Sequence, residues 1–337
     1  MTETTPVRWG ILSTGRIASS FAANLAHVPG ARIAAVGSRS QASADEFAGR
    51  FARPDCRTYA SYDELVADPD VDVVYVGSPH ALHLEHGTLA LEAGKPVLVE
   101  KPLTLNAADS ERLVELARAR GLFLMEAMWM ACNPLIRTLR EGLAAGRWGT
   151  PRQVHADLGF VVDAGAGDRL VETALGAGAL LDMGIYPLTF AHLMLGPAER
   201  LVATAGLSEA GYDQDIAIAG RYAGGAVAAL TASMTSASPR AATIATSTGI
   251  IDLPADFHHP PHAVFQPGDG GPAQRIEASE PLLGTGLGNE AAEVGRCLRA
   301  GLLESPLVPH EQTLTLMRQM DDLRRQVGVR YPGDPTS

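Results

Sequence analysis

From Val7 to about Glu126, short runs of branched, apolar residues alternate with stretches of helical spacing. Runs that are apolar at every position predict strands buried on both faces, which is typical of a parallel sheet covered by helices. The alternation therefore predicts a doubly wound α/β domain. The predicted strands are VRWGIL from Val7, RIAAVGS from Arg32, VDVVYVG from Val71, PVLVE from Pro96 and FLME from Phe123.

The segments between these runs carry helix signals. Ile17, Phe21 and Leu25 recur every four residues, which predicts one stripe of a helix lying on the sheet. Ser61 followed by Glu64 forms a capping box, a common helix start. A longer helix is predicted over residues 106–120, with four inward side chains: Leu113, Val114, Leu116 and Ala117.

The pattern changes after Trp129. A bridging stretch is expected over 134–149, then a strand over 153–162, and the run GAGALLDMGIYPLTFAHLML from Gly176 has helical spacing. Strand-like segments with tight turns follow, which predicts an antiparallel sheet; they cover 200–207, 215–222, 226–236, 241–246 and 250–253. Residues 254–281 are rich in Pro, Gly and His and are predicted as surface loop, and helices are expected over 289–300 and 311–327.

These patterns predict an α/β chain of two domains. Residues 1–127 would form a dinucleotide-binding Rossmann domain with a doubly wound parallel sheet. Residues 128–337 would form an α+β domain with a large, open, mainly antiparallel sheet. Because an open sheet needs something to cover its outer face, we expect a homodimer or homotetramer that pairs through this sheet.

Charge and cysteine content narrow the function classes. The net charge of −11 argues against a nucleic-acid or anionic membrane partner, although a local basic site is compatible with it. Cys56, Cys132 and Cys297 are too far apart for a CxxC zinc site and odd in number, so a reducing compartment fits best. The N-terminus lacks a signal-peptide pattern, and no run reaches about 18 uninterrupted apolar residues. We therefore expect a cytoplasmic chain with no membrane segment.

The first predicted strand runs directly into a glycine-containing turn and a helix start. This arrangement places backbone N–H groups and the positive end of the helix dipole where a pyrophosphate can bind. Ser13 occupies a position where dinucleotide-binding proteins often have glycine, so the motif is imperfect. The predicted cofactor-binding residues of this turn are Gly10, Ser13, Thr14, Gly15, Arg16 and Ile17.

The end of the second predicted strand bears on the choice of cofactor. Ser38 and Arg39 stand where NAD-selective enzymes commonly carry an acidic residue for the ribose 2′-OH. A hydroxyl and an arginine suit a 2′-phosphate instead. We therefore predict NADP, with NAD as the alternative; the other interpretation of Arg39 is a solvated surface side chain.

Histidines cluster after the fourth predicted strand. Ser78, His80 and His83 follow it at the carboxyl end of the sheet, where doubly wound folds bind ligands. His80, His83 and His86 together suggest a metal site. Their spacings of three and six residues do not bring all three rings together on one helix, so we expect no metal there. His80 and His86 are expected at a helix start and on the surface. The second cluster, over 258–262, is expected to face solvent.

Several longer motifs recur in the order of a known family. The chain resembles the glucose-fructose oxidoreductase, inositol dehydrogenase and rhizopine-catabolism (Gfo/Idh/MocA) family, and more narrowly its branch of dimeric dihydrodiol dehydrogenases and NADP-dependent xylose dehydrogenases. The matching segments are WGILSTGRIA, SYDELVADPDVDVVYVGSPHALH, LEAGKPVLVEKPLTLNAAD, LFLMEAMW, GALLDMGIYPL and CLRAGLLESPLVP. They span nearly the whole chain.

The resemblance implies a nicotinamide-dependent dehydrogenase that acts on a sugar or a cyclic vicinal diol, with residues 128–337 as its substrate-binding and oligomerisation domain. It places Lys101 of the Glu100-Lys101-Pro102 motif at the reaction centre with Asp182 and Tyr186, and it places Glu100, Lys101 and His83 near the cofactor. The pattern of this family needs no metal. Many members have His where this chain has Tyr186, and that difference indicates the diol and aldose branch. Trp129 and Arg169 are further substrate candidates.

The predicted chemistry follows from the residue types. A phenol has a pKa of about 10 and is a poor base at pH 7, but a neighbouring ammonium favours its phenolate. Tyr186 is therefore the predicted acid/base and Lys101 its assistant, while Asp182 would hydrogen-bond the substrate or orient its partners. In the alternative structural interpretations, Tyr186 is an ordinary core tyrosine and Asp182 a local cap.

Two other functions remain open at this stage. One is a catalytically silent NADP-binding regulator or assembly subunit, against which the joint presence of Lys101, Asp182 and Tyr186 argues. The other is an oxidoreductase that recycles a tightly held cofactor internally. The residues Met130-Ala131-Cys132-Asn133-Pro134 replace the arginine and aromatic residues common in related sequences, so substrate identity stays open.

Overall fold

The structure is a computed structural model that describes residues 5–165, 167–332 and 334. The chain divides into two compact units: Met1–Cys132 with Leu282–Leu314, and Asn133–Pro281 with Thr315–Ser337. The sequence analysis placed the boundary after residue 127 and assigned everything beyond it to the second domain. In the structure the segment Leu282–Leu314 instead packs with the first unit, a long-range return that local patterns do not encode.

The first unit contains the predicted parallel sheet, with six strands in the order β3-β2-β1-β4-β5-β6. All of its pairings are parallel. The strand order reverses between β1 and β4, the point where doubly wound sheets bind ligands beyond their carboxyl ends. The strands are β1 (Val7–Leu12), β2 (Ala31–Gly37), β3 (Arg57–Tyr59), β4 (Val73–Val76), β5 (Val97–Glu100) and β6 (Leu124–Ala127). The three-residue β3 was not predicted.

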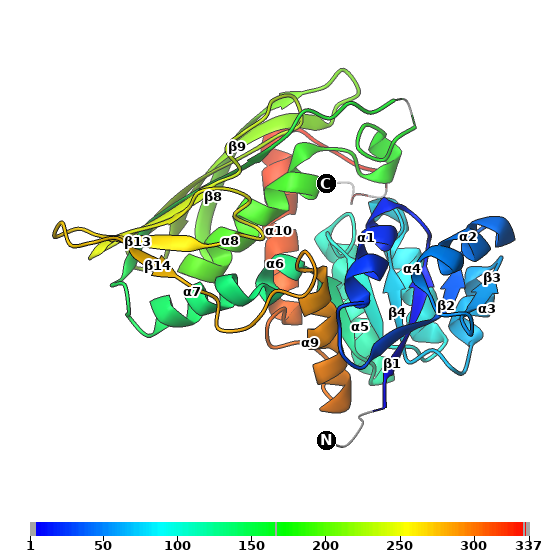
Figure 1. Ribbon diagram of the computed structural model, residues 1–337. Helices are drawn as coiled ribbons and strands as arrows, with labels where there is room; N and C mark the ends of the chain where they lie inside the picture. The colour runs from blue at the N-terminus through cyan, green and yellow to red at the C-terminus, as the bar shows by residue number, and fades with distance from the viewer. Residues whose placement is uncertain (1–4, 166, 333, 335–337) are drawn as a thin grey trace. The chain divides into compact units, whose positions relative to one another are not determined.

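Helices follow the strands of this sheet in the expected alternation (Figure 1). Ser61 caps α3 through the Asp63 N–H, and Asn106 caps α5 through the Asp109 N–H. Of the predicted stripe on α1, Phe21 and Leu25 are buried, but Ile17 is 36% exposed at the helix start. The helices of this unit are α1 (Arg16–Leu25), α2 (Gln41–Phe51), α3 (Tyr62–Ala67), η1 (His80–Leu82), α4 (His83–Glu92), α5 (Ala107–Arg120), α6 (Trp129–Cys132) and α9 (Leu287–Arg299).

The second unit is built on an eight-stranded sheet with the order β14-β13-β12-β11-β7-β10-β9-β8. The β7–β10 pairing is parallel and the others are antiparallel, so the sheet is mixed and mostly antiparallel, as predicted. Its strands are β7 (Pro151–Gly159), β8 (Ala198–Leu207), β9 (Asp213–Tyr222), β10 (Val227–Ser233), β11 (Ala242–Thr246), β12 (Gly249–Leu253), β13 (Ala263–Pro267) and β14 (Gln274–Ile276).

In the second unit the structure adds one helix to the sequence analysis and corrects one prediction. The bridging stretch is the helix α7 (Pro134–Ala144), which starts at an Asn133 cap with proline in its first turn. The predicted surface loop over 254–281 contains β13 and β14, which extend the sheet at one edge. The other helical elements are η2 (Thr173–Leu175), the π-helical turn η3 (Leu180–Gly184), α8 (Ile185–Leu195), η4 (Ala223–Gly225) and α10 (His310–Val327), whose residues from Thr315 onward belong to this unit.

The core helix of the second unit is unusually apolar. By length and composition the segment Thr173–Leu195 could cross a bilayer, but 89% of its most apolar 18-residue window is buried within the structure. Within its unit, α8 packs on β7 and β10 (Figure 1). Such burial is typical of a core helix that lies against a sheet, and it explains why this helix is apolar on nearly every side.

Candidate active site

The turn after β1 has the features of a phosphate site. Ser13 adopts a left-handed φ of 84°, the conformation for which glycine is usually required, so the imperfect motif keeps the expected backbone shape. Its N–H donates to the Gly37 carbonyl. Gly15 precedes α1, and among the described residues no side chain caps this helix start. The positive end of the α1 dipole therefore lies at this turn, as a phosphate site requires.

The glycines of this turn have different surroundings. Gly10 lies inside β1, where an added Cβ would approach a Val71 methyl group to 2.9 Å; its small size serves packing within the unit. At Gly15 the nearest described atoms would be 3.8 Å from such a Cβ, which leaves room for a close ligand. The small size of Gly10 therefore has a packing reason, whereas Gly15 has space beside it.

The predicted 2′-phosphate residues lie beside this turn. The Thr14 and Ser38 hydroxyls are 3.4 Å apart, which joins the ends of β1 and β2. Arg16 and Arg39 are both exposed. Burial raises the pKa of Tyr62, and the positive charge of Arg39 opposes that rise, so the guanidinium acts at this end of the sheet.

His80 begins η1, as expected for a helix start, but His80, His83 and His86 are all buried, so the expectation of a surface position was wrong. His86 Nδ1 lies 2.9 Å from the Ser78 hydroxyl, and its pKa is lowered mainly by burial. His83 is fully buried and connects two loops: Nδ1 lies 2.8 Å from the Pro102 carbonyl and Nε2 lies 2.9 Å from the Ser78 carbonyl. His83 thus fixes the loop after β4 against the loop that contains Lys101.

Lys101 follows β5 directly and is half-buried. Its peptide bond to Pro102 is cis. Glu100, just before it, is buried and accepts hydrogen bonds from the Tyr75 hydroxyl at 2.6 Å and from the Lys101 N–H at 3.2 Å. Glu100 was predicted to contact the cofactor; these two bonds give it a structural role as well, because they hold the backbone that presents Lys101.

Two further buried glutamates lie in the same unit, and the sequence analysis did not predict them. Glu126, in β6, accepts from the Leu103 N–H at 3.0 Å and from the Thr313 hydroxyl at 2.8 Å. Burial raises its pKa to about 7, with a lowering contribution from Lys101. Glu290 on α9 is fully buried, and burial together with Glu100 raises its pKa well above the usual range. The signal for Glu126 was its place as the last residue of FLME; Glu290 has no local signal.

In the second unit, Asp182 and Tyr186 lie four residues apart in one continuous helical run. Asp182 is in the π-helical turn η3 and Tyr186 is in the first turn of α8. Isolated π-helical turns are frequent at functional sites because they displace side chains from regular helical positions. Both residues are buried, with 8% and 7% of their surface exposed.

Arg169, which the sequence analysis offered as a substrate residue, forms an ion pair with Asp182, with Nη1 to Oδ1 at 3.1 Å. The pair joins the loop before η2 to the helical run that carries Tyr186. Trp129, the other substrate candidate, lies half-buried in the first unit, where its ring packs against the backbone of Gly286.

The start of the helical run is fixed by Asp213 on β9. Its carboxylate accepts the Leu180 N–H at 2.6 Å, and burial raises its pKa to about 7. Gly178 has a φ of 137°, and a Cβ there would lie 2.4 Å from Asp213 Oδ1. The run GAGALLD therefore needs glycine at this position for a specific contact.

The histidine loop after β12 contacts the predicted acid/base. The ring centroids of His258 and Tyr186 are 5.1 Å apart. His258, His259 and His262 are half-buried, so the expectation that this cluster faces solvent was wrong. The loop is anchored by Phe257, which is fully buried and contacts Phe190 of α8 edge to face.

The structure thus gathers the predicted residues into two groups. The first unit holds Lys101 and all of the predicted cofactor residues, most of them at the carboxyl ends of β1, β2, β4 and β5. The second unit holds Asp182, Tyr186 and Arg169. A doubly wound sheet whose first helix starts without a side-chain cap from the described residues, with a lysine and buried carboxyl groups in the same unit, is typical of dinucleotide-dependent oxidoreductases.

Comparison with known proteins identifies the family. Residues 7–128 match the model described as oxidoreductase family, NAD-binding Rossmann fold, and residues 136–252 match the Gfo/Idh/MocA C-terminal domain. The chain belongs to the Gfo/Idh/MocA oxidoreductase family, as the motifs suggested, and it is an enzyme of the dehydrogenase and reductase type.

Individual relatives cover nearly the whole chain. A trans-1,2-dihydrobenzene-1,2-diol dehydrogenase from Mus musculus is 34% identical, over 97% of this chain and 99% of its own length. A D-xylose 1-dehydrogenase (NADP(+)) from Hypocrea jecorina is 36% identical, over 97% of this chain and 93% of its own length. Among solved structures, a 3-ketoreductase from Actinomadura kijaniata in complex with NADP and TDP-benzene is 28% identical, with a TM-score of 0.85 over 96% of this chain and 98% of its own.

Proposed function

We propose that this chain is an NADP(H)-dependent oxidoreductase that transfers a hydride between the nicotinamide and a carbinol carbon of a sugar or a cyclic vicinal diol. Tyr186 acts as the acid/base, assisted by Lys101. Support comes from the family, from relatives named as diol and xylose dehydrogenases, and from a 3-ketoreductase of the same fold that is named in complex with NADP.

The choice of NADP rests on the end of β2. Ser38 and the exposed Arg39 offer a hydroxyl and a guanidinium, and a guanidinium can bind a phosphate through two N–H groups. The uncapped start of α1 and the left-handed Ser13 backbone suit the pyrophosphate. The donor set therefore fits a dinucleotide that carries a 2′-phosphate.

Oxidation of the alcohol removes a hydride from its carbon and a proton from its hydroxyl group. Bound NADP supplies the hydride acceptor for oxidation of the alcohol. Tyr186 takes the hydroxyl proton as the carbonyl forms and returns it in the reverse direction. The Lys101 ammonium favours the phenolate form of this base. Asp182, held by Arg169, orients the hydroxyl that reacts.

The observation that carries the assignment is the burial of an ion-paired carboxylate and a phenol in one helical run beside a π-helical turn. A core tyrosine alone would need no neighbouring charge. Buried, ion-paired polar groups next to a π-helical turn are frequent at functional sites.

The test is Tyr186→Phe, assayed with NADP against a panel of pentoses, hexoses, inositols and cyclic diols. We expect kcat to fall by about 100-fold or more, since general acid/base catalysis typically contributes 10²–10⁴-fold. NADPH binding, followed by its fluorescence, should stay within about 2-fold. Tyr222→Phe, at a buried tyrosine of β9 in the same unit, is the matched control.

Near-wild-type turnover in Tyr186→Phe would remove Tyr186 as the acid/base. NADPH binding without turnover on any member of the panel would favour the silent, cofactor-binding regulator instead. A nucleotide that stays with the purified protein through dialysis would favour internal recycling of the cofactor.

A further inference from the structure

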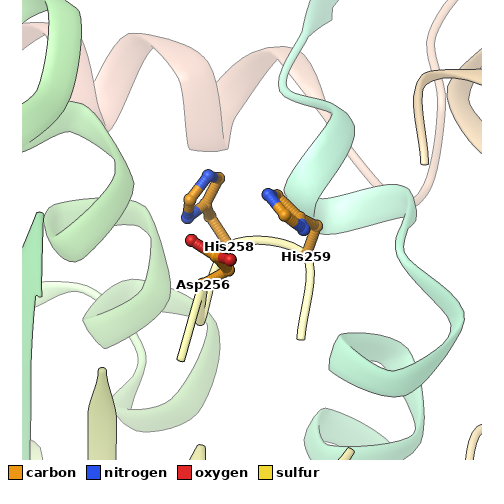
Figure 2. A group of neighbouring side chains, drawn as sticks. All are labelled: Asp256, His258 and His259. Carbon is orange, nitrogen blue, oxygen red and sulfur yellow. The ribbon is translucent and has the colours of Figure 1, made fainter. Parts of the chain in front are cut away.

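Three metal-ligating side chains meet in the loop that follows β12. One ligand atom from each of Asp256, His258 and His259 lies within 4.8 Å of the others, and all three residues are half-buried. Figure 2 shows the three side chains extending from the same loop to the same side. No part of the proposed hydride transfer requires this combination.

The loop holds these side chains in a defined arrangement. Asp256 has a left-handed φ of 46°, which a short polar residue tolerates better than most, and the His259 N–H closes the turn onto the Asp256 carbonyl at 2.7 Å. Phe257 sits fully buried between the two ligand positions, and its N–H donates to the Arg240 carbonyl at 3.0 Å. The ligands therefore project from a turn that is anchored to the core on one side.

We propose that Asp256, His258 and His259 form a binding site for one divalent transition metal ion of the zinc class. Two imidazole nitrogens and one carboxylate oxygen are a common ligand set for zinc, and imidazole selects such ions over Mg²⁺ and Ca²⁺. Tetrahedral ligand atoms around zinc stand roughly 3.3 Å apart. Bringing ligand atoms from 4.8 Å to this spacing requires about 1.5 Å of closure, which rotation of the side chains supplies.

Arg240 limits the affinity of this site. Its Nη2 lies 3.1 Å from Asp256 Oδ1, so a guanidinium already neutralises the carboxylate. A carboxylate can bind a guanidinium through one oxygen and a cation through the other, but the two positive charges repel each other. The geometry thus describes a site of moderate affinity that responds to the metal concentration.

A metal ion bound at this site would act on the acid/base through His258, whose ring contacts Tyr186. A divalent ion bound to His258 would fix the ring against which the phenol packs and so restrict the movement of the phenol. We therefore expect the bound ion to slow turnover at a fixed pH. This consequence rests on the proposed role of Tyr186, whereas the metal site itself does not.

The test is titration of the full-length protein, freed of metal, with Co²⁺ and with Zn²⁺. Visible absorption of Co²⁺ reports its coordination, and calorimetry gives the stoichiometry and Kd for Zn²⁺. We expect one ion per chain and a Kd at least 30-fold weaker in His259→Ala and in Asp256→Asn. His262→Ala, at a half-buried histidine of the same loop outside the cluster, should keep the wild-type Kd.

Arg240→Gln provides a test in the opposite direction. Removing the competing charge should tighten Zn²⁺ binding by about 5-fold or more, and this gain should vanish when His259→Ala is added. The proposal is overturned if the wild type binds no stoichiometric ion, or if His262→Ala weakens binding as much as His259→Ala does. Stoichiometric binding with unchanged kcat would overturn the link to Tyr186 and leave the metal site standing.

Discussion

Arg39 is exposed at the end of β2, yet its charge reaches two groups around the phosphate turn. Burial raises the pKa of Tyr62 and lowers that of His86; the charge of Arg39 opposes the first shift and adds to the second. A surface arginine that acts on both side chains lies over this end of the sheet, where a 2′-phosphate would extend from the adenosine ribose. Its contribution to binding should therefore be specific for NADPH.

Arg39→Ala should weaken NADPH binding by about 10- to 100-fold, since a hydrogen bond to a charged group is worth about 1.5–3 kcal/mol. NADH binding should change less than about 2-fold. Arg50→Ala, at the last turn of α2, removes another cationic side chain of the same unit and serves as the control. Equal losses for the two cofactors would show that Arg39 does not distinguish them.

The burial of Glu126 makes the free energy of unfolding fall as the pH rises from about 4.5 to 7. Burial raises its pKa to about 7 in the folded chain, compared with an ordinary value of 4.5. The folded state therefore holds this proton more tightly than the unfolded state. That contribution to stability is complete below about pH 4.5 and is lost as the pH rises toward 7.

Glu126→Gln should remove this part of the pH dependence. Relative to the wild type, the variant should gain stability between pH 4.5 and pH 7.5, by up to about 3 kcal/mol at 1.36 kcal/mol per pKa unit. Denaturant unfolding at several pH values measures the difference. Glu115→Gln, on the exposed side of α5, should leave the slope unchanged. A Glu126→Gln curve parallel to the wild type would mean that Glu126 is already ionised at pH 5.

The segment from Gly178 to Tyr186 shows how an element positions the chemistry. Gly178 has a backbone conformation that other residues rarely adopt, and Asp213 fills the space where a Cβ would lie. Asp213 also accepts the Leu180 N–H, so it sets where the π-helical turn begins. The positions of Asp182 and Tyr186 follow from this start.

Gly178→Ala should therefore lower both stability and turnover. We expect a loss of about 2 kcal/mol or more from the strained φ and the contact with Asp213. The fall in kcat should exceed what the unfolded fraction explains, because the displaced helical run carries Asp182 and Tyr186. Gly165→Ala is the matched control, since no described atom lies within 4 Å of a Cβ built there. A Gly178→Ala variant with wild-type kcat would separate this turn from the catalytic residues.

Elements with a strong local period were predictable, and those defined by distant partners were not. Strands β1, β2, β4, β5 and β6 form a buried parallel sheet, so their apolar runs identified them. β13 and β14 lie in a stretch rich in Pro, Gly and His, and they are strands because β12 offers an edge for pairing. Glu290 is indistinguishable in sequence from a solvated helical glutamate, and its burial depends on how α9 returns to the first unit.

The candidate site likewise contains residues that the sequence could predict and contacts that it could not. The phosphate turn, Lys101, Asp182 and Tyr186 could be named from motifs, because their chemistry depends on short segments. The ion pair of Asp182 with Arg169 and the contact of Tyr186 with His258 could not, since each joins residues from separate loops. The left-handed Ser13 lies between these cases: the motif predicted a turn, and the structure shows that serine adopts the glycine conformation there.

At the scale of the whole molecule, the exposed face of the eight-stranded sheet stands out because small and apolar side chains face outward from it. Val202, Ala219 and Ala229 lie side by side across β8, β9 and β10, and all three are exposed. A second row, Thr204, Ala217 and Thr231, runs beside it. Small, apolar side chains form a flat surface that another sheet can approach closely, so we propose that a second copy of the chain covers this face.

Ala229→Arg tests this assembly without disturbing the buried side of the sheet, because alternate residues of β10 point to opposite faces. In the homodimer or homotetramer that we propose, one arginine per copy would meet its symmetry mate across a two-fold interface, and desolvating these charges would drive the copies apart. Sedimentation at about 10 µM should then give a monomer with a wild-type circular dichroism spectrum, while Ala119→Arg, on the exposed side of α5, should sediment as the wild type does. A monomeric wild type, or an Ala229→Arg variant of unchanged mass, would show that this face is not where copies meet. The small residues would then need another explanation, such as close approach by a different protein.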